Sequence, residues 1–402
     1  MHNKKNILLI VPGWPSNFKP NFMHFFYAQI FNLATRSNHQ YDVLVPISFW
    51  SLLNFDYIKK YFRHQKFKLL IPDLINVKII PIYYLTLPER FFPRLANDYV
   101  AFKILRFIKF KKFIKYDLVH AHFFKSARVA YKVQKVYNLN YLYTEHTSDY
   151  SFYTMRFNRN EIFRITNAAS CLISVSPQLA ERIIQYNEFL EKRIRVIPNG
   201  IDTNKFSIKN KRNDEIIKFL FIGHLLERKG VKDLLVAFNI AVEMKNNLRL
   251  TIIGNGELNK WCMNYLKIHN LTDKVFMLGV FQNDDLPAII KEHDIFILPS
   301  KNESFGVVVI EAASCGLPSI VTECGGPESI INTSEMGIVL KLPLIGTSLS
   351  DAMIKMSTTL EGYNNQKIRD SIIRRFDWNI VSEEIINLYN CQNSSPENKQ
   401  LV

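Results

Sequence analysis

Two glutamates stand eight positions apart in the segment PSKNESFGVVVIEAASCGLP, residues 299–318. The apolar run 295–298 predicts a buried strand before this segment, and helical spacing predicts a helix after the loop. Backbone amides at a helix N-terminus are free to bind phosphate, so we expect an anion site at this turn. Its candidate residues are Ser304, Phe305, Gly306 and Val307, and Gly306 would let an anion approach the backbone closely.

The two carboxylates of this segment suit different tasks. Glu311, inside the predicted helix, is suited to accepting hydrogen bonds from vicinal hydroxyls such as those of a ribose. Glu303, at the tip of the loop, can reach a sugar or a developing positive centre. The spacing alone leaves a structural alternative open, because paired glutamates are also common on solvated helix surfaces.

A second cluster of chemical groups lies in FLFIGHLLERKG, residues 219–230. A predicted strand runs into a glycine, a short loop and the adjacent cations Arg228 and Lys229. Lys229 is placed to serve as a point charge for a diphosphate, although a lysine near the start of an ordinary surface helix is the alternative. The segment LTIIGNG, 250–256, lacks the third glycine of a dinucleotide-binding turn, so it indicates a close loop approach or a tight turn.

The first half of the chain carries fewer such groups. Gly13 follows the first predicted strand, where a glycine lets a ligand come near the strand end. His146, in TEHTS, follows an apolar run and is expected at a strand's carboxyl end in a cleft, with a hydrogen-bonded loop histidine as the alternative. His120 and His122 point to the same side of a strand by the period of two, but no third ligand supports a metal site there.

The elements that must position these residues alternate between short apolar runs and longer amphipathic stretches. Continuous hydrophobicity of this kind is typical of parallel strands buried on both faces. Both halves are therefore expected to be doubly wound α/β domains that bind ligands at the carboxyl ends of their strands and face each other across a cleft. The polar segment 207–215 marks the boundary between them. The predicted strands are 7–11, 42–45, 77–80, 118–120, 141–144, 172–175, 219–222, 250–253, 275–278, 295–298 and 319–321, and the clearest helices are 231–244 and 304–314.

Composition excludes several classes of protein. The 402 residues are 48% hydrophobic and 22% charged, which is too apolar for a disordered chain and long enough for two domains. Five scattered cysteines without a CxxC indicate neither a disulfide framework nor a zinc cluster, and fit a reducing compartment. The apolar run 7–11 is too short for a signal peptide, and no segment offers the ~20 apolar residues of a membrane-spanning helix.

The net charge of +15 calls for anionic partners. The excess is centred on KILRFIKFKKFIKYD, residues 103–117, whose helical projection is basic on one side and apolar elsewhere. This pattern indicates contact with an anionic membrane surface, and the alternative is a core helix with a solvated lysine face. No recognition motif for nucleic acid accompanies the charge, so nucleic acid is not expected as a partner.

The order and spacing of these motifs resemble the family 4 retaining glycosyltransferases, which have the GT-B fold of two facing Rossmann-like domains. The likeness spans most of the chain and also includes PNGID at 198–202, GGPES at 325–329 and FDWNIVSEEIINLY at 376–389. The last of these is similar to the helix that crosses back onto the first domain. The resemblance implies an acceptor domain at 1–206, a nucleotide-sugar donor domain at 207–375 and a crossover helix at about 376–392.

The resemblance also implies roles for individual residues. Lys229 would bind the donor diphosphate and Glu311 the ribose, while amides around Phe305 and Gly306 would bind phosphate or sugar. Lysine and helix-terminal amides would neutralise the leaving diphosphate in place of a metal, and the chain contains no DxD. The resemblance therefore implies neither a metal nor another cofactor.

The reacting sugar would lie close to Glu303 and to His146, which matches the family's cleft histidine. The nucleotide base would lie near Phe281, and the acceptor would bind largely on the first domain. One residue departs from the family pattern, because His224 stands where an arginine is common in the phosphate loop. A neutral histidine supplies a donor but no fixed cation, which would leave Lys229 and Arg228 with more of the diphosphate.

These observations predict a retaining, metal-independent glycosyltransferase of the hexosyltransferase type. It would move a sugar from a UDP- or GDP-sugar to a hydroxyl of a glycan or lipid-linked acceptor in lipopolysaccharide, capsule or a related surface polysaccharide. The expected location is cytoplasmic and peripheral, on the cytoplasmic face of the inner membrane. The alternatives are a nucleotide-sugar epimerase or a phosphorylase on the same fold, and a non-catalytic donor-binding subunit, which the change at His224 suggests.

Overall fold

The computed structural model describes residues 4–16, 22–48, 68–84, 93–110, 116–147, 158–208 and 215–392. The chain forms two compact units. Unit 1 combines residues 1–175, 180–198 and 381–402, and unit 2 combines residues 176–179 and 199–380. Residues 199–206, which the sequence analysis assigns to the first domain, belong to unit 2 in this division.

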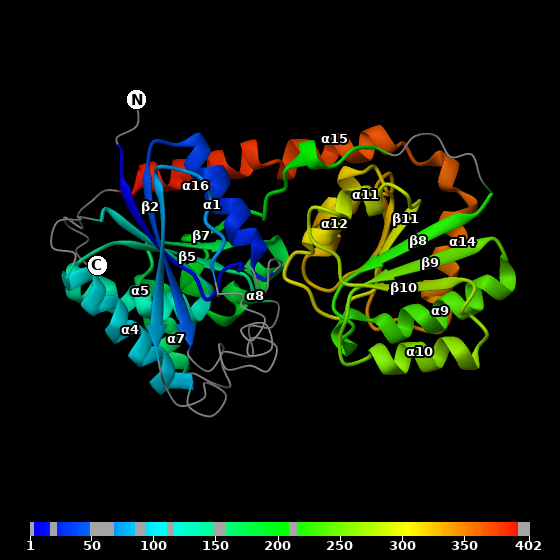
Figure 1. The fold of residues 1–402 in the computed structure, drawn as a ribbon, viewed down its shortest axis with the longest axis horizontal. Helices are drawn as coiled ribbons and strands as arrows, with labels where there is room; N and C mark the ends of the chain where they lie inside the picture. Colours follow the sequence, from blue (N-terminus) through cyan, green and yellow to red (C-terminus); the bar gives the residue numbers. More distant parts are fainter. Residues whose placement is uncertain are drawn as a thin grey trace. The chain divides into compact units, whose positions relative to one another are not determined.

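Unit 1 is built on a parallel sheet of seven strands (Figure 1). The strands are β1 (Asn6–Ile10), β2 (Gln40–Ser48), β3 (Val77–Tyr84), β4 (Leu118–His122), β5 (Tyr141–Glu145), β6 (Cys171–Ser174) and β7 (Ile194–Val196). Their order in the sheet is β3-β2-β1-β4-β5-β6-β7. The order reverses between β1 and β4, and open α/β sheets bind ligands at such a switch point.

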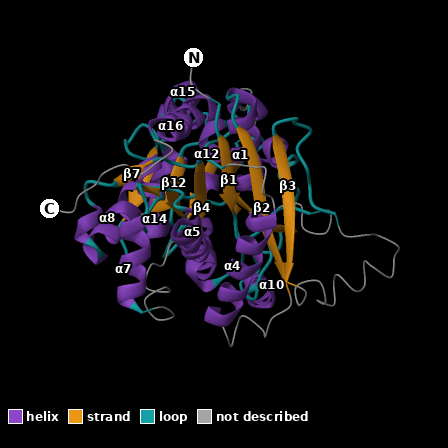
Figure 2. Ribbon diagram, turned by 90° about the vertical axis from the view of Figure 1, so that its left-hand side faces the viewer, coloured by secondary structure: helices purple, strands orange, loops and turns teal. Residues whose placement is uncertain are grey.

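Helices cover both faces of this sheet. They are α1 (His24–Arg36), α4 (Pro93–Phe110), α5 (Phe123–Tyr137), α7 (Arg159–Ala168), α8 (Pro177–Tyr186), the short η1 (Glu188–Leu190) and α16 (Trp378–Cys391). Helices α4, α5 and α7 pack together on one side of the strands (Figure 2). On the other side, Phe26 of α1 contacts His122, and Tyr389 of α16 contacts His120.

Unit 2 is built on a parallel sheet of six strands. The strands are β8 (Ile217–Ile222), β9 (Leu248–Ile253), β10 (Val275–Gly279), β11 (Ile295–Leu298), β12 (Ser319–Thr322) and β13 (Gly337–Leu340). Their order is β10-β9-β8-β11-β12-β13, with the switch point between β8 and β11. This arrangement repeats the topology of unit 1, as expected for two Rossmann-like domains.

The helices of unit 2 form two groups. Helices α9 (Val231–Met244), α10 (Asn259–Ile268) and α14 (Ser348–Thr358) pack on one another. Helices α11 (Leu286–Ile290), α12 (Val307–Ser314), α13 (Pro327–Ile330) and α15 (Asn365–Phe376) form the second group, in which α12 contacts the other three. The short turns η2 (Thr203–Lys205), η3 (Glu227–Lys229) and η4 (Leu360–Gly362) complete the unit.

The predicted fold class is confirmed, and each of the eleven predicted strands is present. Strands β4, β5 and β11 are buried along their whole length, which is why their sequences are continuously apolar rather than alternating. The sequence analysis missed β7 and β13. β7 has only three residues, two of them exposed, and β13 begins at a glycine, so neither carries a strong strand pattern.

The helices differ from prediction mainly at their ends. α9 has the predicted bounds, whereas α12 begins at Val307 because Gly306 adopts a left-handed φ of 99°. Of the basic segment 103–117, residues 103–110 form the end of α4, and residues 111–115 lie outside the described ranges. Within those ranges, no helix combines the length and apolar character needed to cross a bilayer.

A buried cation fixes α4 to its neighbours. Arg128 of α5 has a side chain that is 9% exposed, and it pairs with Asp98 of α4 and Glu161 of α7, each at 2.6 Å. Desolvation opposes the charged guanidinium, but these two partners outweigh it and raise the pKa of Arg128 above its ordinary value. The three helices are therefore held as one layer, which sets the orientation of α4 on the surface of unit 1.

Candidate active site

Most of the predicted donor residues lie at the carboxyl edge of the unit 2 sheet, on its loops and on α12, whereas Gly13, also predicted to bind the donor, lies in unit 1. Two glycines let these loops interlock closely. Gly230, with a φ of 69°, approaches β11, since a Cβ there would lie 1.9 Å from the carbonyl oxygen of Pro299. A Cβ on Gly254, with a φ of 143°, would lie 1.9 Å from the carbonyl oxygen of Gly223. Only glycine fits these positions, so the GxG turn after β9 supports the loop after β8.

An ion pair joins two of the predicted catalytic residues. Lys229, at the end of η3, pairs through Nζ with Oε1 of Glu303, in the loop after β11. Their side chains are only 13% and 11% exposed. Ser300 also donates to Glu303 Oε1, at 3.1 Å, and the amide of Lys301 donates to the carbonyl of Arg228 at 2.7 Å. Residues that are 74 positions apart in sequence thus form one polar centre.

The start of α12 presents backbone amides without a capping side chain. Gly306 is its N-cap residue, and no side chain bonds to the first turn. Ser304, Gly306 and Val307 are half-buried there, whereas Phe305 is 2% exposed and packs edge-on against Phe376 of α15, with ring centroids 5.6 Å apart. The turn is therefore held by its aromatic residue, and no side chain caps the amides for which the sequence analysis predicts an anion.

Glu311 is a half-buried carboxyl on the same helix. Its Oε2 is buried and has no hydrogen-bond partner among the described residues. Desolvation raises the pKa of Glu311 to about 7. A buried oxygen without a partner is costly, so a ligand hydroxyl that donates to it would be favourable.

Three further predicted donor residues surround these groups less closely. His224 and Arg228 have exposed side chains on the loop after β8, and Phe281 is half-buried after β10. The structure brings together Lys229, Glu303 and the start of α12, and it places His224, Arg228 and Phe281 on the neighbouring loops of the same sheet edge.

In unit 1, His146 belongs to a cluster of three histidines. It follows β5, and its Nε2 lies 3.1 Å from Nδ1 of His122. The rings of His120 and His122 are 4.3 Å apart, and His120 bonds Thr144 and Tyr389, each at 2.7 Å. His120 and His122 do lie on one side of β4, as predicted.

Burial keeps these imidazoles neutral. Desolvation lowers the pKa of His120 and of His146 to about 3, and it lowers the pKa of His122 well below its ordinary value. His146 Nδ1 is buried without a hydrogen-bond partner among the described residues. It can therefore bond a ligand hydroxyl as a neutral group. No group of three or more histidine, cysteine or acidic side chains in the described ranges is arranged for a metal ion.

Gly13 lies at the end of β1 in unit 1. A Cβ at this position would lie 2.5 Å from Cε1 of Phe22, so the ring closes directly over the backbone. The neighbouring rings of Phe25 and Phe26 contact His146 at 5.1 and 5.6 Å. The start of α1 is thus close to the histidine cluster, as expected for the switch point of this sheet.

Sequence reasoning missed the role of Glu328. Its carboxylate accepts hydrogen bonds from the amides of Cys324, Gly325 and Gly326, at 3.3, 2.8 and 3.0 Å. The signal was visible in GGPES, because an acidic residue that follows two glycines at the start of a helix is placed to bond their amides. The sequence analysis named His122 but assigned it no function.

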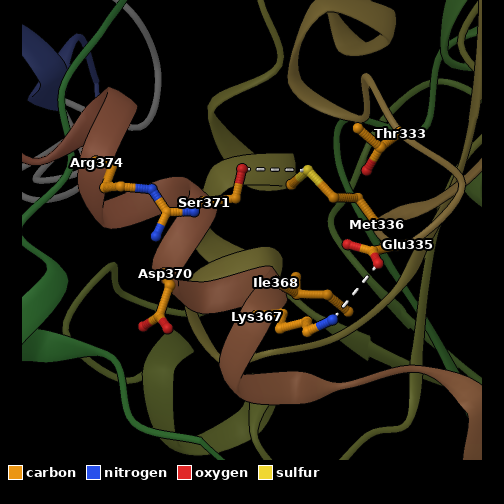
Figure 3. Close-up of a pocket in the computed structure, with 8 residues that line it drawn as sticks. All are labelled: Thr333, Glu335, Met336, Lys367, Ile368, Asp370, Ser371 and Arg374. Carbon is orange, nitrogen blue, oxygen red and sulfur yellow. Dashed lines mark hydrogen bonds and ion pairs between the residues drawn. The ribbon is translucent and has the colours of Figure 1, made fainter.

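A surface pocket of about 340 Å³ lies apart from these loops, on α15 of unit 2 (Figure 3). Lys367 and Glu335 pair across it at 3.6 Å, and Ser371 donates to the sulfur of Met336 at 3.4 Å. None of the predicted site residues lines this pocket. The Lys367 and Glu335 side chains are 65% and 69% exposed, so their pairing adds little stability.

Two families match consecutive parts of the chain. Residues 35–205 match the family described as glycosyltransferase family 4. Residues 202–367 match the family described as glycosyl transferases group 1. The two matches together run through both sheets and include Lys229, Glu303 and Glu311.

Individual proteins support the same assignment. An uncharacterized glycosyltransferase of Methanocaldococcus jannaschii is 26% identical over 298 residues, covering 68% of this chain and 75% of the relative. The UDP-Gal:alpha-D-GlcNAc-diphosphoundecaprenol alpha-1,3-galactosyltransferase of Escherichia coli is 27% identical over 331 residues, covering 74% and 82%. The solved structure of Anabaena HepE in complex with UDP-glucose shares the fold, with a TM-score of 0.67, 18% identity and coverage of 96% and 99%.

Proposed function

Since the chain belongs to the family 4 glycosyltransferases of GT-B fold, we propose that it transfers a sugar, with retention of configuration, from a UDP- or GDP-sugar to a hydroxyl of a glycan or lipid-linked acceptor. The observation that carries this proposal is the polar centre of unit 2, in which Lys229 and Glu303 lie at the edge of the sheet beside the uncapped start of α12. A cation and free amides together suit a diphosphate.

The nucleotide-sugar part of the proposal draws on the relatives. HepE was solved with UDP-glucose, and the name of the E. coli relative gives UDP-Gal as its donor. In this chain, Lys229 would bind the diphosphate and the buried Oε2 of Glu311 would accept a bond from the ribose. Phe281 would lie near the base, and Glu303 near the transferred sugar.

The proposed mechanism uses no metal. As the sugar–phosphate bond breaks, negative charge grows on the leaving diphosphate, and Lys229 with the amides of residues 304–307 would stabilise that charge. The acceptor hydroxyl would attack from the same face, and the leaving phosphate would take its proton. His146, neutral because of its low pKa, would bond a sugar hydroxyl rather than act as a base.

We further propose that this sugar transfer belongs to the synthesis of a surface polysaccharide such as lipopolysaccharide or capsule. The acceptor named for the E. coli relative is carried on diphosphoundecaprenol, a lipid. A lipid-linked acceptor requires an enzyme that works at a membrane surface, and we propose the cytoplasmic face of the inner membrane.

Helix α4 supports the membrane part of the proposal. Among the α4 residues whose burial the structure describes, the exposed ones recur at helical spacing and form one stripe, which consists of Leu95, Tyr99, Phe102, Arg106 and Lys109. The first three are apolar or aromatic and are 60%, 37% and 55% exposed, while the last two are basic. Apolar residues beside cations suit the interface of an anionic bilayer.

The donor proposal is tested by thermal shift with UDP, GDP, ADP and CMP, first without divalent metal and then with it. A ligand that binds the native state raises the melting temperature by mass action. We expect a metal-independent shift with UDP or GDP that is lost in Lys229→Ala. The matched control is Lys232→Ala, since Lys232, in the first turn of α9, pairs at 2.9 Å with the exposed Glu227 of η3. No shift with any nucleotide would contradict the proposal.

A further inference from the structure

The carboxylate of Glu328 accepts hydrogen bonds from several backbone N–H groups of the preceding loop. Three successive amides, from Cys324 to Gly326, point at its two carboxylate oxygens. Bonds between an ionised carboxylate and backbone amides are stronger than those between neutral partners. The carboxylate of Glu328 therefore restrains the segment 324–326, together with the hydroxyl of Ser176, which donates to the carbonyl of Gly325 at 3.0 Å.

This segment is the support on which the donor loop rests. The amide of Glu303 donates to the carbonyl of Cys324 at 3.3 Å. A Cβ on Gly326 would lie 2.5 Å from both N and Cα of Phe305, so the two backbones already touch. Gly306 likewise approaches Pro327, since a Cβ on Gly306 would lie 3.2 Å from Cγ of Pro327.

The far end of this support is anchored as well. Arg375 of α15 donates to the carbonyls of Ser329 and Ile330, the latter at 3.0 Å, at the end of α13. The same guanidinium lies 4.5 Å from the ring of Phe376, which packs on Phe305. The donor loop is thus held between Glu328 on one side and α15 on the other.

We propose that Glu328 is a positioning residue for sugar transfer: by fixing residues 324–326 it sets the place of Glu303, Phe305 and the free amides at the start of α12. It acts through the loop and needs no contact with the substrate. The inference rests on the proposed function, because it takes the turn at 303–306 as the part of the site that holds the diphosphate and sugar.

The test compares Glu328→Gln with wild type by calorimetric titration with UDP and GDP, and with the corresponding nucleoside. The amide of glutamine replaces one acceptor oxygen with a donor, so it cannot accept from all three N–H groups. We expect the dissociation constant of the bound diphosphate to rise about tenfold and that of the nucleoside to change less than about twofold. A purely structural role would lower the fraction of folded protein and leave both constants unchanged.

A second variant perturbs the same contact from the other side. Gly326→Ala leaves Glu328 in place but drives a Cβ into Phe305, so it should weaken diphosphate binding in the same selective way. Glu323→Gln, an exposed change on the same loop, is the matched control. The inference is overturned if wild type binds the diphosphate and both Glu328→Gln and Gly326→Ala bind it equally well. If wild type binds no diphosphate, the proposed function itself fails.

Discussion

Lys229 and Glu303 form a close ion pair between two loops of unit 2. The pair is nearly withdrawn from water, and it joins the two residues expected to serve the diphosphate and the sugar. A diphosphate that reaches Lys229 must therefore compete with the glutamate or share the ammonium with it.

Glu303→Gln should tighten the binding of a nucleoside diphosphate while it abolishes transfer. Removal of the carboxylate charge leaves Lys229 free for phosphate, and a gain of about tenfold corresponds to about 1.4 kcal/mol. Titration of UDP or GDP measures the gain. Glu335→Gln is the control, because it breaks a lysine–glutamate pair on the surface at 3.6 Å. Weaker diphosphate binding in Glu303→Gln would contradict the competition.

The raised pKa of Glu311 should make the stability of the free protein depend on pH. The ordinary pKa of 4.5 applies to the unfolded chain and the value of about 7 to the folded protein. Between these values the folded protein retains a proton that the unfolded chain has lost, so the free energy of unfolding falls as pH rises. The Glu311→Gln variant has no carboxyl at this position, so this fall in its free energy of unfolding should be absent.

The variant should therefore be more stable than wild type above about pH 7, by about 1–3 kcal/mol, and similar to it near pH 4. Urea unfolding at both pH values measures the difference. Glu323→Gln, which removes an exposed carboxyl on a neighbouring loop, is the control. An equal effect of Glu311→Gln at both pH values would show that the titration of this carboxyl is not the cause.

Tyr389→Phe should destabilise unit 1. The hydroxyl of Tyr389 bonds His120 Nδ1 at 2.7 Å in a fully buried position, and the change leaves the imidazole nitrogen unpaired. The expected cost is about 1–3 kcal/mol in the free energy of unfolding, measured in urea. Tyr83→Phe, at a position that is 56% exposed, should cost almost nothing. Equal effects of the two changes would refute a stabilising role for the His120 bond.

Charge reversal on α4 should weaken binding to anionic vesicles. Each basic residue near such a surface contributes about 1 kcal/mol, so Lys109→Glu should lower the partition coefficient about tenfold. Lys135→Glu makes the same charge change on α5 and should have a smaller effect. Sedimentation with vesicles of increasing anionic lipid content measures the partition. If vesicle binding did not depend on the content of anionic lipid, the alternative would be favoured, in which α4 is a core helix with a solvated lysine face.

Much of the fold could be predicted because buried parallel strands have a strong pattern. Runs such as 295–298 are apolar at every position, and both sheets bury them on two faces. The strands that the sequence analysis missed are those whose formation depends on pairing with neighbouring strands. β13 pairs with β12 along its whole length, yet its sequence begins at Gly337, and that glycine is its only fully buried residue.

The candidate site could be predicted only as separate loops. Glu303 and Lys229 were each singled out by local chemistry, but no local pattern shows that they pair, because the contact depends on the order of β8 and β11 in the sheet. Glu328 was missed because its partners are backbone amides, which every residue carries. The structure supplies these relations between loops, and the roles of the residues in catalysis remain predictions.

The division of the chain between the two units also sets an order for synthesis. Unit 1 takes its last segment from residues 381–402, so most of α16 is made only after the segments of unit 2. Until Tyr389 arrives, His120 and the rings of His39 and Tyr41 have no cover from that helix. The buried centre of unit 1, although made mostly from early residues, therefore gains its cover by α16 only after nearly all of unit 2 has been translated.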